Sequence, residues 1–279
     1  MERAEEILKK TIVAALEEDL GFAGDITSQA VVPSDLQGRA SVRAKEEGVI
    51  AGLFVARAVF KAVDSEIEFI EDVEDGAEVK RGQRVAQIVG AVRSILAGER
   101  VVLNFLAHLS GIATLTRKFA DKARPFQVTI KDTRKTTPNI RILEKYAVRV
   151  GGGKSHRFGL YDAVLIKDNH IKAAGGILPA IEQAARNLRP GTKIEVEVDS
   201  LDDVTEALRG KADIIMLDNM DVASIKAAVR KIGAKALVEV SGGVTLNNVE
   251  EIARTGINFI SVGAITQSAK ALDFSLNLE

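Results

Sequence analysis

From Phe126 onward, short apolar runs rich in β-branched residues alternate with longer amphipathic segments. This alternation is typical of repeated β-strand–α-helix units, whose strands form a parallel sheet. The pattern predicts strands at 128–131, 163–167, 194–198, 214–217, 236–240 and 257–262. Ser200 with Asp203, then Asp221 and Thr245, are expected to cap the helices between the later strands.

A polar residue or a glycine follows each predicted strand. In a (β/α) barrel such positions gather at one mouth, where enzymes of this architecture carry out their chemistry. The repetition favours a barrel over a doubly wound sheet. Because six or seven strands are recognisable instead of eight, we expect an incomplete barrel. The positions are Lys131 to Lys135, Lys167, Glu197, Asp218, Ser241 to Gly243, and Gly263.

The chain before residue 126 has a different organisation. We expect a helix at 4–20, strands at 40–44, 48–52 and 66–70, a helix at 53–63, and a long helix at 99–123 that leads into the second domain. Residues 75–90 look like a strand pair from a biotinyl- or lipoyl-type hybrid barrel. No lysine stands convincingly at a hairpin tip there, so a structural sandwich is the preferred interpretation over a carrier domain.

The composition limits the class of protein. The chain has no cysteine, which excludes disulfides and thiolate chemistry. It has no run of about 18 apolar residues and no apolar signal core at its charged start, so we expect a cytoplasmic protein without a membrane span. A net charge of −1 argues against a general nucleic-acid binder.

Positive charge is concentrated in residues 131–172. This segment holds ten Lys and Arg against four Asp and Glu, whereas the rest of the chain carries a net charge of −7. A packed core gains nothing from crowded cations, but a site for a small polyanion requires them. The glycine-rich stretch 151–157 ends in Lys154, His156 and Arg157, and glycines let backbone N–H groups approach an anion.

Further candidates for a ligand site are glycines and carboxylates at the strand ends. The loops at 241–243 and 263–264 follow the last two strands, where many barrels bind a phosphate. Glu197 and Asp218 can hold ribose hydroxyls or Mg²⁺. Glu195 shares the strand parity of Glu197, so an ion pair lining the barrel is the alternative for either residue. His156 alone is a weak candidate for a catalytic base.

Several long motifs in this order resemble the quinolinate phosphoribosyltransferase family. They are Gly24-Asp25-Ile26-Thr27, Asp132-Thr133-Arg134-Lys135-Thr136-Thr137-Pro138, Gly151-Gly152-Gly153-Lys154-Ser155-His156-Arg157, Leu165-Ile166-Lys167-Asp168-Asn169-His170, Met216-Leu217-Asp218-Asn219 and Glu239-Val240-Ser241-Gly242-Gly243. The resemblance implies an α/β fold with an N-terminal open α/β sandwich (1–105), an incomplete, seven-stranded β/α barrel (106–265), and a tail (266–279) that packs back on the sandwich.

The resemblance also implies the reaction and its residues. Quinolinate and 5-phosphoribosyl 1-pyrophosphate would give nicotinate mononucleotide, pyrophosphate and CO₂, with Mg²⁺ held mainly through substrate phosphates. The chain would form a homodimer or a higher oligomer, in which Arg100 reaches the neighbouring barrel. Lys135, Glu197 and Asp218 would be catalytic, the two carboxylates also being candidate Mg²⁺ ligands. The substrate-binding residues would be Arg100, Thr133, Arg134, Lys135, His156, Arg157, Lys167, Glu197, Asp218, Ser241, Gly242, Gly243, Gly263 and Ala264.

Two alternatives stay open on the sequence. A sister enzyme of the same fold could use another heteroaromatic acid such as nicotinate, although the crowding of cations favours a diacid. A non-catalytic protein that binds polyanions or nucleic acid is the other, and it would bind with a steep salt dependence. The aromatic residues among the cations are few, which weakens the nucleic-acid version.

Overall fold

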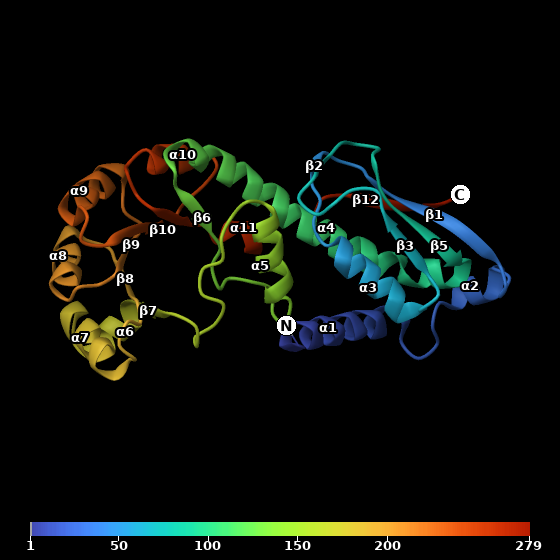
Figure 1. Ribbon diagram of the computed structural model, residues 1–279, viewed down its shortest axis with the longest axis horizontal. Coiled ribbons are helices and arrows are strands. Elements are labelled where there is room, and N and C mark those ends of the chain that lie inside the picture. The colour runs from blue at the N-terminus through green and yellow to red at the C-terminus, as the bar shows by residue number, and fades with distance from the viewer. Residues whose placement is uncertain (1) are drawn as a thin grey trace. The chain divides into compact units, whose positions relative to one another are not determined.

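The computed structural model describes residues 2–279, with side chains from Glu5 onward (Figure 1). Its contacts divide the chain into two compact units. The first unit consists of the chain up to Arg117, Thr136–Gly151 and Thr266–Glu279, and the second of Lys118–Lys135 and Gly152–Ile265. The division by contacts therefore differs from a single boundary at 105/106, because the helix α4 (Val92–Ala123) runs through that point without a break.

Most helices of the first unit bury apolar side chains, whereas the helix at 26–31 buries only Ser28. The helices of this unit are α1 (Glu2–Leu20), α2 (Ile26–Val31), α3 (Leu53–Val63), α5 (Arg141–Val150) and most of α4. The structure confirms the helix expected at 53–63, which buries Leu53, Val55, Ala56, Val59 and Phe60. Asp75 caps this helix, since its carboxylate accepts the backbone N–H groups of Gly52 and Leu53 at 2.9 and 3.1 Å.

The first unit has an antiparallel sheet in the order β12-β1-β5-β3 and a separate two-stranded sheet, β2-β4. The strands are β1 (Gln37–Ala44), β2 (Gly48–Val49), β3 (Glu68–Glu71), β4 (Glu78–Val79), β5 (Arg84–Ala91) and β12 (Phe274–Leu278). The expected strand pair within 75–90 is wrong, because β4 pairs with β2 whereas β5 pairs with β1 and β3. The turn at Lys80–Gln83 carries the chain from one sheet to the other.

The second unit is the parallel sheet predicted from the βα repeat. Its order is β6-β11-β10-β9-β8-β7, and every neighbouring pair is parallel. Figure 1 shows α7, α8 and α9 on the outer side of these strands. The strands are β6 (Thr129–Lys131), β7 (Val164–Ile166), β8 (Ile194–Val198), β9 (Ile214–Asp218), β10 (Leu237–Ser241) and β11 (Phe259–Ser261).

The barrel is incomplete, with six strands within residues 2–279 instead of the expected seven. The glycine-rich stretch takes the place beside β6 where a further strand would lie, but it makes only one isolated parallel bridge, between Lys131 and Lys154. Three consecutive glycines disfavour an extended strand because they lose the most conformational entropy on ordering. β6 and β7 are therefore the two ends of the strand order.

Further helical segments occur before, between and after these strands in the chain. They are η1 (Arg124–Phe126), α6 (Asp168–Ala174), α7 (Ile177–Asn187), α8 (Leu201–Arg209), α9 (Val222–Ile232), α10 (Val249–Ala253) and α11 (Ala264–Gln267). Ser200 accepts from Asp203 N–H and Asp221 from Ser224 N–H, as predicted. The expectation for Thr245 is wrong, because α10 begins at Val249 and its N-cap is Asn248.

The helix α4 is longer than the predicted 99–123. The stretch Val92–Phe126 is long and apolar enough to cross a membrane by composition, with a mean hydropathy of 1.3 in its best window. However, 61% of that window is buried inside the protein, which is the behaviour of a core helix in a folded domain.

Candidate active site

The second unit brings the polar residues at the strand ends to one edge of its sheet, as the sequence predicted. The strand registers show this directly. Ser261 lies opposite Lys131, Ser241 opposite Asp218, and Glu197 opposite Met216, two residues before Asp218. Because all six strands are parallel, their carboxyl ends share one mouth.

Lys167 and Glu197 form an ion pair at this mouth. Lys167 Nζ lies 2.7 Å from Glu197 Oε2, and the lysine side chain is 43% exposed. The backbone N–H of Lys167 donates to His170 Nδ1 at 2.9 Å, which fixes the start of α6. The backbone of this lysine is therefore fixed, and its side chain stays partly exposed while paired with Glu197.

Asp218, Asn219 and Gly242 form a tight junction between the ends of β9 and β10. Asn219 has a positive φ of 54°, donates through Nδ2 to Asp218 Oδ2 at 2.7 Å, and donates its backbone N–H to Ser241 O at 3.0 Å. Gly242 has a φ of +86°, and a Cβ there would overlap the side chain and backbone of Asn219. The glycine is therefore required by close packing as well as by backbone conformation.

Asp132 fastens the glycine-rich stretch to β6. Its buried carboxylate accepts the backbone N–H of His156 at 2.8 Å. Lys154 adds two backbone hydrogen bonds, donating to Ile130 O at 2.8 Å and accepting from Asp132 N–H at 3.2 Å. After Asp132 the chain turns into solvent, and Lys135 N–H donates to Thr133 Oγ1 at 3.0 Å. Arg134 and Lys135 follow as exposed residues.

Arg157 is a buried cation beside another cation. Its residue exposure is 9%, and its Nη1 donates to Ala163 O at 3.4 Å. Burial lowers the pKa of its guanidinium, and the neighbouring charge of Arg134 lowers it further. The charges of Glu195 and Asp162 act on this pKa in the opposite direction, so Arg157 lies among charges of both signs.

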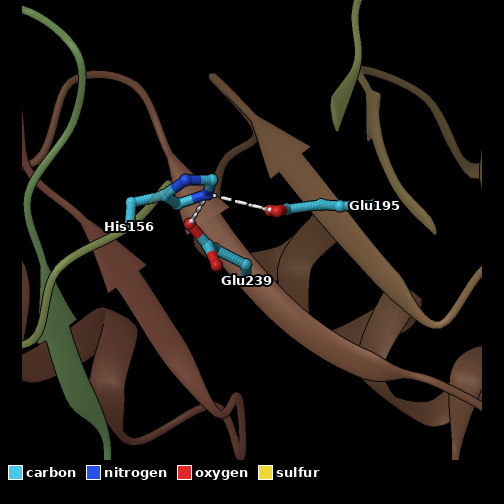
Figure 2. A group of neighbouring side chains, drawn as sticks. All are labelled: His156, Glu195 and Glu239. Carbon is cyan, nitrogen blue, oxygen red and sulfur yellow. Dashed lines mark hydrogen bonds and ion pairs between the residues drawn. The ribbon is translucent and has the colours of Figure 1, made fainter. Parts of the chain in front are cut away.

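His156 lies in a buried cluster with two glutamates from the strands (Figure 2). Its Nε2 is 3.1 Å from Glu195 Oε2 and 3.4 Å from Glu239 Oε1, and its side chain is 8% exposed. Its Nδ1 accepts the backbone N–H of Arg157 at 2.7 Å. Both ring nitrogens are thus used inside the protein.

Glu239 is held from two further strands. Lys131 Nζ lies 2.5 Å from its Oε2, and Ser261 Oγ donates to its Oε1. Burial raises the pKa of Glu239, and the charge of Glu195 raises it further. The three ligand atoms of His156, Glu195 and Glu239 lie within 4.8 Å of one another, as in a metal site. However, Lys131 already supplies the cation that this cluster needs.

The structure gathers the predicted site residues of the second unit and also reveals residues that sequence reasoning missed. Arg100 belongs to the first unit, as an exposed residue on α4. Gly263 and Ala264 are half-buried at the end of β11. The missed residues are Asp132, Glu239 and Ser261, which are buried and bind other site residues. A carboxylate inside an apolar strand, as in Leu237–Ser241, was the signal available for Glu239.

Comparisons with known proteins agree along the whole chain. Residues 25–110 match the model of the quinolinate phosphoribosyl transferase N-terminal domain, and residues 112–277 match that of its C-terminal domain. The quinolinate phosphoribosyltransferase [decarboxylating] 1b of Nicotiana tabacum is 42% identical over 98% of this chain and 82% of its own. A probable nicotinate-nucleotide pyrophosphorylase [carboxylating] of Bacillus subtilis is 41% identical over 97% of this chain and 93% of its own.

Solved structures of similar proteins point to the same family. The nicotinate-nucleotide pyrophosphorylase from Francisella tularensis superposes with a TM-score of 0.94 and 42% identity, over 98% of this chain and 96% of its own. With both halves of the sequence matched and full-length relatives above 40% identity, this chain belongs to the quinolinate phosphoribosyltransferase family.

Proposed function

We propose that this chain transfers the phosphoribosyl group of 5-phosphoribosyl 1-pyrophosphate to quinolinate, with loss of CO₂, in NAD synthesis. The products are nicotinate mononucleotide, pyrophosphate and CO₂. The observation that carries the proposal most directly is the pair of Arg134 and Arg157, two neighbouring cations of which one is buried. A carboxylate matches each guanidinium group with two parallel hydrogen bonds, so two neighbouring arginines suit a dicarboxylate.

Arg134, Arg157 and Lys167 bind the two carboxylates of quinolinate in this proposal, helped by Thr133. Guanidinium groups match carboxylates with two parallel hydrogen bonds, which also orients the pyridine ring. A monoacid such as nicotinate would leave part of this charge unpaired. The arrangement of cations therefore supports the diacid as substrate.

Lys135 is proposed to stabilise the charge that develops on the departing pyrophosphate. The ring nitrogen of quinolinate attacks the ribose C1 with its own lone pair, so this step needs no strong base. The C1–O bond breaks and its electrons leave with the pyrophosphate. A donor aimed at that charge contributes about 10²–10³ in rate in comparable sites.

The carboxylates of Glu197 and Asp218 fit a ribose or a Mg²⁺ ion. One oxygen of Glu197 meets Lys167 and one of Asp218 meets Asn219, so each group is oriented by a neighbour. Mg²⁺ usually binds one or two carboxylates together with substrate phosphates, and this donor set suits it. When bound, the ion would neutralise charge on the pyrophosphate.

The loops Ser241–Gly243 and Gly263–Ala264 are proposed to bind the 5′-phosphate. Gly242 and Gly243 both have positive φ, at +86° and +61°, which turns backbone N–H groups toward a common side. After transfer, the pyridinium nitrogen accepts the electron pair left when CO₂ departs from the neighbouring carbon. A proton then replaces CO₂ at that carbon and gives nicotinate mononucleotide.

We also propose a homodimer in which Arg100 of one protomer completes the site of its partner. Arg100 is exposed on α4, as a residue that meets another chain must be. The second unit has an open strand edge at β7, beside a cavity of about 580 Å³. Leu160 and Tyr161 stand next to it, 71% and 74% exposed. The cytoplasmic location stays a prediction.

One assay tests the proposed function. Quinolinate labelled in its 2-carboxylate is incubated with the phosphoribosyl donor and Mg²⁺, and labelled CO₂ is counted together with pyrophosphate. We expect both products in equal amounts, and neither without the donor. Nicotinate in place of quinolinate is the matched control. Pyrophosphate release with nicotinate but not with quinolinate would contradict the proposal.

A further inference from the structure

His156 has no ring nitrogen left for a substrate. Its Nδ1 accepts the backbone N–H of Arg157, and its Nε2 faces Glu195 and Glu239. A nitrogen that accepts an N–H carries no proton, so the proton of the neutral ring is on Nε2, where it meets the carboxylates. Figure 2 shows the ring edge pointing toward both glutamates. The imidazole is therefore a neutral donor and acceptor within the barrel.

The two glutamates are themselves fixed. Glu195 comes from β8 and Glu239 from β10, and the second is gripped by Lys131 of β6 and Ser261 of β11. Four of the six strands thus contribute to one buried cluster. A buried carboxylate is stable only when its oxygens receive donors, and truncating one partner is costly. The ring of His156 therefore contacts two glutamates whose positions are fixed by the sheet.

This cluster acts on Arg157 through the backbone. The N–H of His156 is held by Asp132, and the next N–H, that of Arg157, is held by the His156 ring itself. Further backbone hydrogen bonds join Lys154 to Ile130 and Asp132, so the glycine-rich stretch is held against β6 on both sides of Ser155. The two consecutive hydrogen bonds from His156 N–H and Arg157 N–H to side-chain acceptors therefore fix the backbone from which Arg157 projects.

We infer that His156 is a positioning residue for Arg157 and adds no charge to the anion site. The cluster of Glu195, Glu239, Lys131 and Ser261 fixes the imidazole ring, and the ring in turn accepts the backbone N–H of Arg157. The inference rests on the proposed function, because it specifies how one cation of the quinolinate site is preorganised. It departs from the expectation that His156 binds substrate directly.

The first test measures the tautomer of His156 in the unmodified enzyme. The chain has three histidines, so two variants, His108→Gln and His170→Gln, assign the ¹⁵N signals of all three imidazoles. We expect His156 to give the signals of an imidazole whose proton is on Nε2 and whose Nδ1 is unprotonated, as the hydrogen bond from Arg157 N–H requires. Adding quinolinate should leave them unchanged. An imidazolium signal on binding would overturn the inference.

The second test uses two replacements of opposite character. His156→Asn keeps a neutral acceptor near the Nδ1 position, whereas His156→Lys keeps a cation and loses that acceptor. A positioning role predicts that KM for quinolinate rises no more than about threefold in the Asn variant and on the order of tenfold in the Lys variant, the cost of an unpaired buried N–H. A direct cationic contact predicts the opposite order.

The readouts separate this inference from the function itself. KM for the phosphoribosyl donor should change less than KM for quinolinate in both variants, whereas a general folding defect would alter both together with the melting temperature. If the Lys variant fails to fold, the tautomer measurement still decides. Absence of turnover in the unmodified enzyme would refute the proposed function and leave the tautomer measurable.

Discussion

Gly242→Ala tests whether the junction between β9 and β10 is as close as the structure describes. An alanine at a φ of +86° adopts a left-handed conformation, which costs about 1 kcal/mol. Its Cβ also overlaps Asn219, and part of that contact is backbone nitrogen at 2.8 Å, which cannot rotate away. Overpacking of this kind adds about 1–3 kcal/mol.

Alanine variants of two other glycines distinguish the cost of the left-handed backbone from the cost of the overlap with Asn219. Gly82 has nearly the same φ, +84°, and Gly243 has +61°, but a Cβ at either position meets nothing within 4 Å. Gly82→Ala and Gly243→Ala should therefore show the conformational cost alone. Gly242→Ala should be about 2 kcal/mol less stable than Gly82→Ala, which corresponds to a melting temperature lower by about 4–8 °C for a chain of this size.

Thermal unfolding followed by circular dichroism measures this difference. KM for the phosphoribosyl donor, measured on the same samples, should rise in Gly242→Ala, because the proposed phosphate loop can no longer approach Asn219. In Gly82→Ala this constant should not change. Equal melting temperatures for Gly242→Ala and Gly82→Ala would refute the packing argument, since they would mean that the overlap relaxes without cost.

Three further predictions follow from the site. Lys135→Ala and, separately, Arg134→Ala should each lower turnover by about 10²–10³ in steady-state assays, because each removes a donor from the anion site; an unchanged kcat in Arg134→Ala would refute its assignment. Mixing inactive Arg100→Ala and Arg134→Ala chains should restore up to about a quarter of the activity, since half of randomly exchanged dimers are hybrids with one intact site of two; no recovery after verified subunit exchange would contradict the shared site. Finally, the raised pKa of Glu239 means that this carboxyl binds its proton more tightly in the folded state than in the unfolded state. The free energy of unfolding should therefore fall as the pH rises above 4.5, the ordinary pKa of a glutamate. In Glu239→Gln, urea unfolding at several pH values should show a shallower decline, and an equal slope would exclude this carboxyl as its source.

The parts of the fold that sequence predicted well are those with local causes. Residues 194–198 alternate within a β-branched run, and β8 has those bounds. Ser200 and Asp221 cap their helices because the acceptor and its N–H lie three residues apart. By contrast, the strand partner of Glu78–Val79 depends on a segment about 30 residues earlier in the chain, and periodicity carries no information about it.

The site divides in the same way. Sequence identified the cations at the strand ends, because parallel strands bring consecutive carboxyl ends to one mouth. The resemblance to the family implied that His156 binds substrate, whereas the residue pattern alone made it only a weak candidate for a catalytic base. Its partners, Glu195 and Glu239, lie about 40 and 80 residues away, and only the folded sheet places them against the ring. The sequence pattern could not predict roles that depend on contacts between residues so far apart in the chain.

Carboxylates of the protein itself can compete with quinolinate for the arginines of the anion site. Glu195 and Glu239 are buried carboxylates of the same unit, and the charge of Glu195 acts on the guanidinium of Arg157. Were either glutamate to pair with Arg157, the charge intended for quinolinate would be neutralised. The glutamates instead accept from Lys131, Ser261 and the His156 ring. Because the two carboxylates have these other donors, Arg157 keeps its positive charge available for quinolinate.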